Sequence, residues 1–280
     1  MIPAVAAVAG CNVINPAEPV PTYIKIDSFH FVQHDPVEEG PIAHNITCAW
    51  IYYNNNPIGA FDLPCNVPVI TEGDKGLISV WPGIALNGLV DLQPIYAFYN
   101  FDSTTLVTDP GGVREFTPVA KYLNDAKFPY KEDFEIGNSF QAFDPDATGQ
   151  PVIQRTKEAQ YVLSGGGGGL IELTADHPYS ENISNTGFSI PQGEAYIEIS
   201  YKCSVPFEIG MYNTLNTGVD AYNYIFGVKA TDTWKKIYIE LGSFTGTYKG
   251  KDHKVLIKTS LTSGQSSGYV ALDNIKVVTF

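Results

Sequence analysis

In the stretch Ala195-Tyr196-Ile197-Glu198-Ile199-Ser200-Tyr201, apolar side chains recur at every second position. Successive side chains of a β-strand point to opposite faces, so this pattern predicts a strand with one apolar face. The stretch from Lys236 to Leu241 repeats the pattern. Strands with one apolar and one wet face are typical of antiparallel sheets that pack in pairs, so the sequence predicts a β-sandwich.

Similar stretches fill the chain on both sides. Eight of them predict a jelly roll for the second half of the chain, residues 128–280; they are 160–163, 170–173, 195–201, 207–211, 222–228, 234–241, 253–259 and 268–280. About seven shorter strands with frequent turns predict an immunoglobulin-like sandwich for residues 22–127; they include 23–32, 46–53, 58–63, 76–81, 89–101 and 113–122. The predicted fold class is therefore all-β, with two antiparallel β-sandwich domains.

Composition agrees with this division and restricts the function. A chain of 280 residues, 44% of them hydrophobic, suits two domains of roughly 100–150 residues each. The 26 Gly and 19 Pro residues, together with 17 Tyr and 15 Phe, indicate β-structure with many turns. The net charge of −13 argues against nucleic acid and against electrostatic binding to anionic lipid.

The N-terminus resembles a targeting signal. The apolar run 2–9 is far shorter than the roughly 20 residues that span a bilayer, but it suits the apolar region of a cleaved signal. With Val8-Ala9-Gly10-Cys11 it resembles the lipobox of bacterial lipoproteins. The resemblance implies that Cys11 is acylated after residues 1–10 are removed, and that the Pro-rich residues 12–21 tether the domains to a membrane. The alternative is an ordinary apolar N-terminus with a buried cysteine.

Three short motifs of the second half resemble the galactose-binding and carbohydrate-binding-module jelly rolls. They are Glu-Asp-Phe-Glu (132–135), Thr-Trp-Lys-Lys-Ile (233–237) and Val-Ala-Leu-Asp-Asn-Ile-Lys-Val (270–277). With its lipobox and tether, the whole chain also resembles outer-membrane lipoproteins of the Bacteroidota, a likeness that names no activity. The first resemblance implies a structural Ca²⁺ where the first and last strands meet, at Glu135 and Asp273. Calcium needs six to eight oxygen ligands, and the alternative is that Asp273 caps a turn or faces solvent.

Catalytic patterns are weak, so we predict that the protein is not an enzyme. The string Gly264-Gln265-Ser266-Ser267-Gly268 matches a nucleophile elbow, but it leads into a strand rather than a helix and is better explained as a hairpin loop. The acidic loop 144–149 and the glycine run 165–169 lack the residues that complete a calcium loop or a phosphate loop. The five histidines form no ligand spacing.

Two aromatic clusters are candidate contact sites, at residues 96–101 and 222–226. Exposed rings at Tyr96, Tyr99, Tyr222 and Tyr224 would suit stacking on sugars or a protein contact, whereas buried rings would be core. The leading hypothesis is a non-catalytic outer-membrane lipoprotein, held only by its lipid anchor, that is an accessory interaction subunit of a cell-envelope complex. The alternative is a carbohydrate-binding lipoprotein that uses the jelly roll. Which membrane face it occupies stays open.

The other three cysteines lie in the predicted domains. Cys48 and Cys65 flank a predicted hairpin with the turn Asn54-Asn55-Asn56-Pro57. The expected register does not favour a disulfide between them, so unpaired small apolar cysteines are the preferred interpretation.

Overall fold

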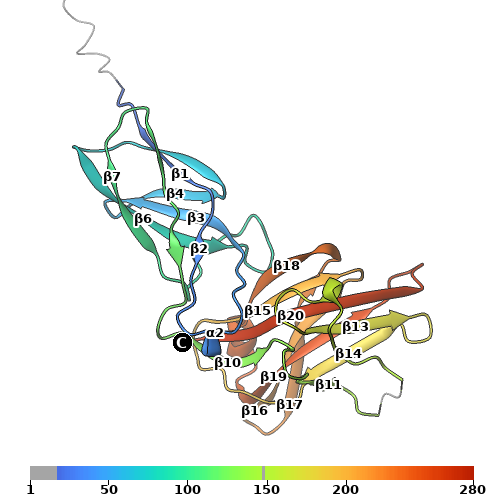
Figure 1. Cartoon of the computed structure of the whole chain (residues 1–280). Helices are drawn as coiled ribbons and strands as arrows, with labels where there is room; N and C mark the ends of the chain where they lie inside the picture. Colours follow the sequence, from blue (N-terminus) through green and yellow to red (C-terminus); the bar gives the residue numbers. More distant parts are fainter. Residues whose placement is uncertain (1–17, 147–148) are drawn as a thin grey trace, which may run out of the picture.

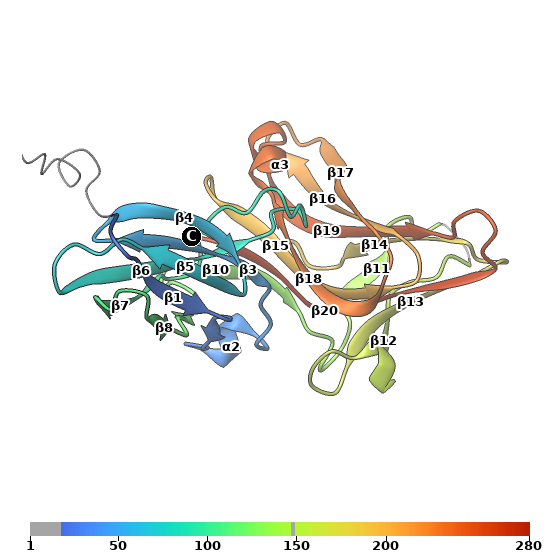
Figure 2. The same cartoon turned by 90° about the horizontal axis from the view of Figure 1, so that it is seen from above.

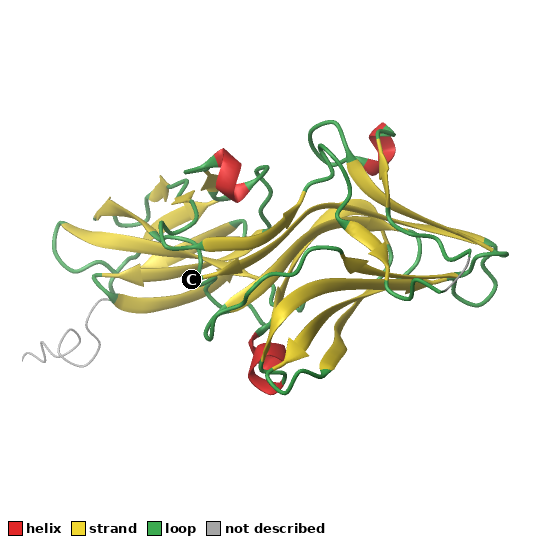
Figure 3. Ribbon diagram, turned by 90° about the horizontal axis from the view of Figure 1, so that it is seen from below, coloured by secondary structure: helices red, strands yellow, loops and turns green. Residues whose placement is uncertain are grey.

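A computed structural model describes residues 18–146 and 149–280. The chain forms two β-sandwiches that lie end to end, as Figure 1 and the perpendicular view of Figure 2 show. Strands make up almost all of the regular structure, and the helices are single short turns at the margins (Figure 3). None of the helices in the described ranges is long and apolar enough to cross a membrane.

The first domain is an immunoglobulin-like sandwich. Its elements are β1 (Thr22–Ile26), β2 (His30–Phe31), α2 (Pro36–Glu39), β3 (Ile46–Tyr53), β4 (Asn56–Asp62), β5 (Cys65–Val69), β6 (Lys75–Ile84), β7 (Asp102–Val107), β8 (Val113–Glu115) and β9 (Val119–Ala120). The sheet β4-β3-β6-β7 faces the shorter pairings β5-β1-β8 and β2-β9. The turn between β3 and β4 consists of Asn54 and Asn55, both with positive φ, which matches the right-handed twist of a two-residue hairpin.

The second domain is a jelly roll. Its elements are β10 (Lys127–Glu132), β11 (Phe140–Ala142), β12 (Gln154–Thr156), η1 (Ala159–Tyr161), β13 (Gly168–Thr174), β14 (Tyr179–Ser184), β15 (Ala195–Cys203), β16 (Phe207–Leu215), β17 (Asp220–Val228), β18 (Thr231–Glu240), α3 (Gly242–Thr247), β19 (Gly250–Ser260) and β20 (Ser267–Thr279). One sheet has the order β12-β13-β20-β15-β18, with β10 also paired to β20, and the other has the order β11-β14-β19-β16-β17. Its core lies between these two sheets and contains Ile197, Ile199, Ile209 and Ile257.

The face of β15 that the sequence predicted to be solvent-exposed is buried. Every residue from Ala195 to Tyr201 is buried, because the first domain covers the outer side of the six-stranded sheet. Tyr196, Tyr238 and Val278 of the jelly roll belong to the same hydrophobic cluster as the first domain's interior. The two domains therefore share one continuous core at their junction.

A buried carboxylate lies at the centre of this junction. Glu198 is fully buried and accepts hydrogen bonds from the hydroxyls of Tyr96 (2.6 Å) and Tyr122 (2.8 and 2.9 Å). Lys236 Nζ lies 2.5 Å from Glu198 Oε2. Burial raises the pKa of Glu198, but the charges of Lys236 and Lys276 and these hydrogen bonds outweigh it, so the pKa lies below its usual value. Glu198 is thus an anion that both domains enclose.

Several predicted strands differ from the structure. Residues 89–101, all of which the structure describes, form turns and isolated bridges rather than a strand. Residues 160–163 begin in the 3₁₀ turn η1, not in a strand. The strand expected at 23–32 is interrupted between β1 and β2. Cys48, Cys65 and Cys203 are free thiols.

Candidate functional site

The outer side of the sheet β14-β19-β16-β17 carries a regular array of aromatic and charged side chains, which we call the open face. The strand register sets the rows of this array. Glu181, Lys258 and Glu208 lie in one row, and Lys254, Tyr212 and Tyr222 in another. Between these rows lie Leu256, Gly210 and Tyr224. The face therefore combines rings with both signs of charge.

Tyr224 lies across the sheet toward the opposite edge. Its hydroxyl donates to Glu181 Oε1 on β14, although Tyr224 itself is on β17. Gly210 makes this crossing possible, because a Cβ there would lie 3.0 Å from Tyr224 Cδ1 and 2.6 Å from the carbonyl oxygen of Asn223. The Nζ atom of Lys258 lies 3.9 Å from the centroid of the Tyr224 ring, a cation–π contact.

The carboxylate of Glu181 accepts hydrogen bonds from two tyrosines. The hydroxyl of Tyr179 donates to Glu181 Oε2 over 2.7 Å, while Oε1 accepts from Tyr224. Burial and the bond to Glu181 raise the pKa of both tyrosines, so both hydroxyls stay protonated as donors. Next to them, Lys258 forms an ion pair of 2.9 Å with Glu208. These contacts fix the polar groups of the open face before any ligand arrives.

Tyr222 is the most exposed ring of the open face, with 53% of its surface accessible. The ring of Phe143, which follows β11, meets it edge-on at a centroid distance of 5.1 Å. Large aromatic side chains are usually buried, so an exposed ring that a second ring holds in place indicates a contact surface. The predicted contact residues Tyr222 and Tyr224 thus lie on one face, and Tyr222 is accessible.

The other two predicted contact residues are wrong. Tyr96 and Tyr99 are 0% and 1% exposed, and they pack between the two domains beside Tyr196 and Tyr238. Burial raises the pKa of both phenols well above the usual value, and the charge of Glu198 adds to the effect. Their role is core and hydrogen bonding at the junction, which is the alternative that the sequence left open.

Glu135 and Asp273 lie near one another and hold the same loop. Asp273 Oδ2 accepts from the amides of Leu163 (3.0 Å) and Ser164 (3.2 Å), and Glu135 accepts from the amide of Gly166 (2.9 and 3.0 Å). The Arg155 guanidinium donates to the carbonyl oxygens of Phe134 and Glu135. Burial raises the pKa of Asp273 to about 6, and amide hydrogen bonds partly oppose this. No group of three or more His, Cys, Asp or Glu side chains in the described ranges could hold a metal.

Two further residues singled out in the sequence are Ser266 and Cys11. Ser266 lies in the exposed loop between β19 and β20; these strands belong to different sheets, so the loop connects the two sheets and is not the hairpin that the sequence predicted. Cys11, the predicted acylation site, lies outside the described residues.

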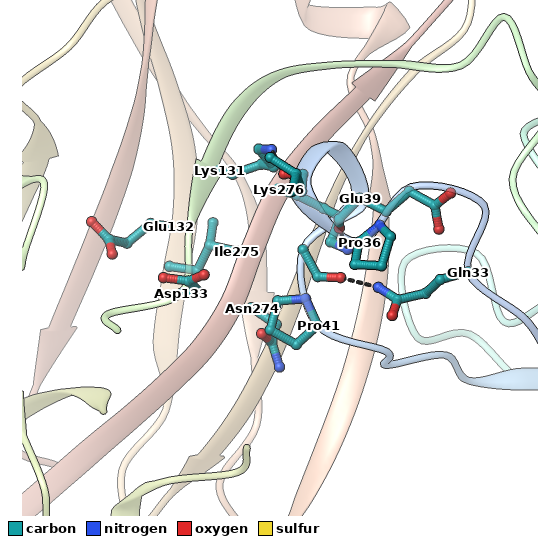
Figure 4. A pocket seen from close by; sticks show the side chains of 12 residues that line it. Gln33, Pro36, Glu39, Pro41, Lys131, Glu132, Asp133, Asn274, Ile275 and Lys276 are labelled. Atoms are coloured by element: carbon teal, nitrogen blue, oxygen red, sulfur yellow. Dashed lines mark hydrogen bonds between the residues drawn. The ribbon is translucent and has the colours of Figure 1, made fainter. Parts of the chain in front are cut away.

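A cavity of about 540 Å³ lies between α2 and the second domain (Figure 4). The ammonium groups of Lys131 and Lys276 are taken by the carbonyl oxygens of Val37 and Glu39, so both lysines fasten α2 to the jelly roll. Burial and the charge of Lys236 lower the pKa of Lys276 to about 7. Glu39 Oε2 and Asn274 Oδ1 have no partner in residues 18–146 and 149–280. The two side chains point in different directions, so the cavity is better explained as part of the junction.

Sequence reasoning missed other members of these surfaces. Tyr179 and Glu181 lie on β14, which was not predicted. Trp81 and Phe101 stack at a centroid distance of 4.4 Å on the outer side of the first domain's larger sheet, beside a hollow that Tyr52 also lines. The sequence contained a signal for Tyr52 and Trp81, because each lies on a predicted strand at a position that alternates with the core residues.

No protein-family model and no curated protein matches this sequence. Among solved structures, the xylan-binding domain CBM22-1 of Paenibacillus barcinonensis Xyn10C is 14% identical, has a TM-score of 0.38, and covers 54% of this chain and 94% of its own. The structure of TmCBM61 in complex with β-1,4-galactotriose is 12% identical, has a TM-score of 0.35, and covers 52% of this chain and 92% of its own. The K2 cleaved adhesin domain of Lys-gingipain is 13% identical, has a TM-score of 0.37, and covers 56% and 99%.

Proposed function

We propose that this protein binds glycans through the open face of its jelly roll. The observation that carries the proposal is the exposed ring of Tyr222, held by Phe143 beside the hydrogen-bonded group of Tyr179, Glu181 and Tyr224. This was the alternative function expected from the sequence. It now stands ahead of the envelope-subunit hypothesis.

The chemistry of the open face suits a sugar. A pyranose ring has an apolar C–H side, which stacks on an aromatic ring, and a rim of hydroxyls, which bond to charged groups. Tyr222 offers the ring, while Glu181, Glu208 and Lys258 offer acceptors and a donor within one row. Together with Lys254 of the neighbouring row, the two carboxylates are matched by two ammonium groups, so an uncharged glycan is favoured over a strongly charged one.

A glycan array with the full chain tests the proposal, followed by calorimetric titration of the best ligand. Replacing Tyr222 by alanine is expected to weaken binding about tenfold or more, since removal of a central aromatic contact costs about 1–2 kcal/mol. Tyr161→Ala is the matched control, because Tyr161 is a partly exposed tyrosine whose ring contacts the ring of Tyr269, outside the open face. Equal loss in both variants, or no glycan bound by the wild-type protein, would contradict the proposal.

We also propose that Cys11 anchors the protein to the outer membrane. The first described residues enter β1 at the end of the first domain that lies away from the jelly roll (Figure 1). An anchor before this point would hold the open face at the far end of the molecule, away from the lipid surface. Mass spectrometry of Cys11 from native membranes tests this proposal. An unmodified Cys11 would refute it.

The proposal includes no catalytic role. It is supported by the position of Ser266 in an exposed loop that leads into β20, where no helix follows it. The calcium site that the sequence suggested at Glu135 and Asp273 is not part of the proposal. As arranged, the two carboxylates accept backbone amides and Arg155 takes neighbouring carbonyl oxygens, so the residues do not offer the six to eight oxygens that Ca²⁺ needs.

Docking to an envelope protein is the second candidate function. Its support is the half-exposed aromatic surface of Tyr52, Trp81 and Phe101 on the first domain, with Leu77 43% exposed on the same strand as Trp81. Aromatic side chains are enriched in protein interfaces. A pull-down in mild detergent should recover a stoichiometric partner that Trp81→Ala loses. A protein that elutes alone would oppose this candidate.

A further inference from the structure

A second hollow lies where the first domain overhangs the six-stranded sheet of the jelly roll. We call it the junction groove; it has a volume of about 740 Å³, which is within the range of small-molecule sites. Its floor is Ser200 on β15, and Trp234 on β18 lines one part. His44, from the segment before β3, and Ser164, from the loop before β13, line other parts. Four separate segments of the chain therefore converge on it.

The floor of the junction groove contains polar groups without partners. Ser200 lines the groove and is 1% exposed, and its Oγ has no hydrogen-bond partner among the described residues. The Nδ1 atom of His44 is also buried and has no partner within the described part of the chain. Ser164 Oγ accepts from Asn274 Nδ2 over 3.1 Å, so its own proton is free to donate. A buried polar atom without a partner costs free energy, so these groups indicate a ligand that supplies the missing bonds.

The side chains that hold these groups are fixed in place. The imidazole of His44 stacks on Phe31 at a centroid distance of 5.3 Å. Burial and the charge of Lys236 lower its pKa, so the ring is neutral near pH 7. Ser200 lies in the middle of β15, between its partners Lys236 on β18 and Asp273 on β20. The polar groups are therefore preorganised, which lowers the cost of binding.

The charge of the lining favours an uncharged ligand. Among the residues that the structure describes, no aspartate or glutamate lines the groove. The ammonium of Lys236 is already taken by Glu198 and by the carbonyl oxygen of Ala43, and Lys235 lies at the exposed rim. Much of the remaining wall is apolar, with Ile42, Val90 and Leu163 54%, 73% and 39% exposed, while Asn45 and Thr47 add polar groups. A ligand for this site needs hydroxyls for the floor and an apolar side for the walls.

We propose that the junction groove binds one uncharged sugar ring, as a second glycan site separate from the open face. Ser200 and His44 bond to its hydroxyls, and Trp234 and the aliphatic rim pack on its C–H side. The inference rests on the proposed function, because it assigns the same class of ligand to another site. The ring would contact both domains at once, since His44 belongs to the first and Ser200 and Trp234 to the second.

Saturation-transfer NMR of the full chain with D-glucose, D-galactose, D-xylose and N-acetyl-D-glucosamine tests this site. Ser200→Val fills the floor and removes the hydroxyl, and it is expected to weaken binding of the preferred sugar about tenfold. We expect the substitution to keep the fold, because Ser200 Oγ bonds to none of the described residues and valine suits a strand. An unchanged melting temperature checks this. Trp234→Ala should give the same loss of binding, whereas Tyr222→Ala should leave the groove signal in place.

The outcomes separate the two sites. A signal lost in Ser200→Val and kept in Tyr222→Ala supports the groove. A signal kept in Ser200→Val and Trp234→Ala but lost in Tyr222→Ala overturns the groove and leaves the proposed function standing. A wild-type protein that shows no signal with any of the four sugars also overturns it, and the glycan array then decides the proposed function by itself.

Discussion

Replacing Glu198 by glutamine is expected to destabilise the whole protein. The amide keeps the shape of the carboxylate but removes its charge, while Lys236, whose side chain is 4% exposed, stays in place 2.5 Å away. Lys276, 2% exposed, also loses the nearby anion. Breaking a buried ion pair by removing one partner costs about 3–5 kcal/mol. For a chain of this size, such a loss lowers the melting temperature by about 10 °C.

Urea denaturation followed by tryptophan fluorescence and by circular dichroism measures this cost. Trp50 and Trp81 report on the first domain and Trp234 on the second. Because Glu198 bonds to Tyr96 and Tyr122 across the junction, the two domains of the wild-type protein should unfold in one coincident transition. In Glu198→Gln the transition should shift to lower urea and separate into two steps.

A paired substitution distinguishes the ion pair from simple packing. Glu198→Leu combined with Lys236→Met replaces both charges by apolar groups, which is often neutral or stabilising for a buried pair. We therefore expect the double variant to be more stable than either single variant. If Glu198→Gln costs less than about 1 kcal/mol, the carboxylate is effectively solvated, and the conclusion that both domains enclose it is wrong.

Three further predictions concern pH, backbone and metal. The pKa of Lys276 is about 7 in the fold and 10.5 in the unfolded chain, so the unfolded state binds the extra proton between these values; stability should rise from pH 7 toward pH 10 in urea melts, and less so in Lys276→Met. Gly210→Val places a Cβ 2.6 Å from the carbonyl oxygen of Asn223, so it should cost about 1–3 kcal/mol in the same melts and displace Tyr224, seen as a loss of glycan binding. Millimolar CaCl₂ should leave the melting temperature unchanged, because Glu135 and Asp273 already accept amides; a rise of several degrees would instead confirm the calcium prediction.

Local patterns predicted the fold class because apolar and polar residues alternate clearly along several strands of the two packed jelly-roll sheets. The strands at Ala195–Cys203, Thr231–Glu240 and Ser267–Thr279 were all recognised in this way. What the pattern could not show is that the polar side of β15 is also covered. Glu198 and Ser200 look like solvent-facing residues in the sequence, and only contacts with a distant part of the chain bury them.

The candidate site was predicted in part for the same reason. The sequence pointed to Tyr222 and Tyr224 because they alternate on a strand, but the equally aromatic Tyr96 and Tyr99 lie in a segment of turns that fills the junction. Whether a ring is buried there depends on the packing of the second domain, which no local pattern encodes. Tyr179 and Glu181 were missed because β14, Tyr-Ser-Glu-Asn-Ile-Ser, has few apolar residues.

The shared core at the junction has a consequence for how such a protein can evolve. Domains that meet through a few linker residues can be exchanged by recombination, since each keeps its own interior. Here a gene fragment that encodes only the jelly roll would expose Tyr196, Tyr238 and Val278, and would leave Glu198 and Lys236 without the tyrosines that surround them. We therefore expect a recombination event that separates the two domains to be strongly disfavoured.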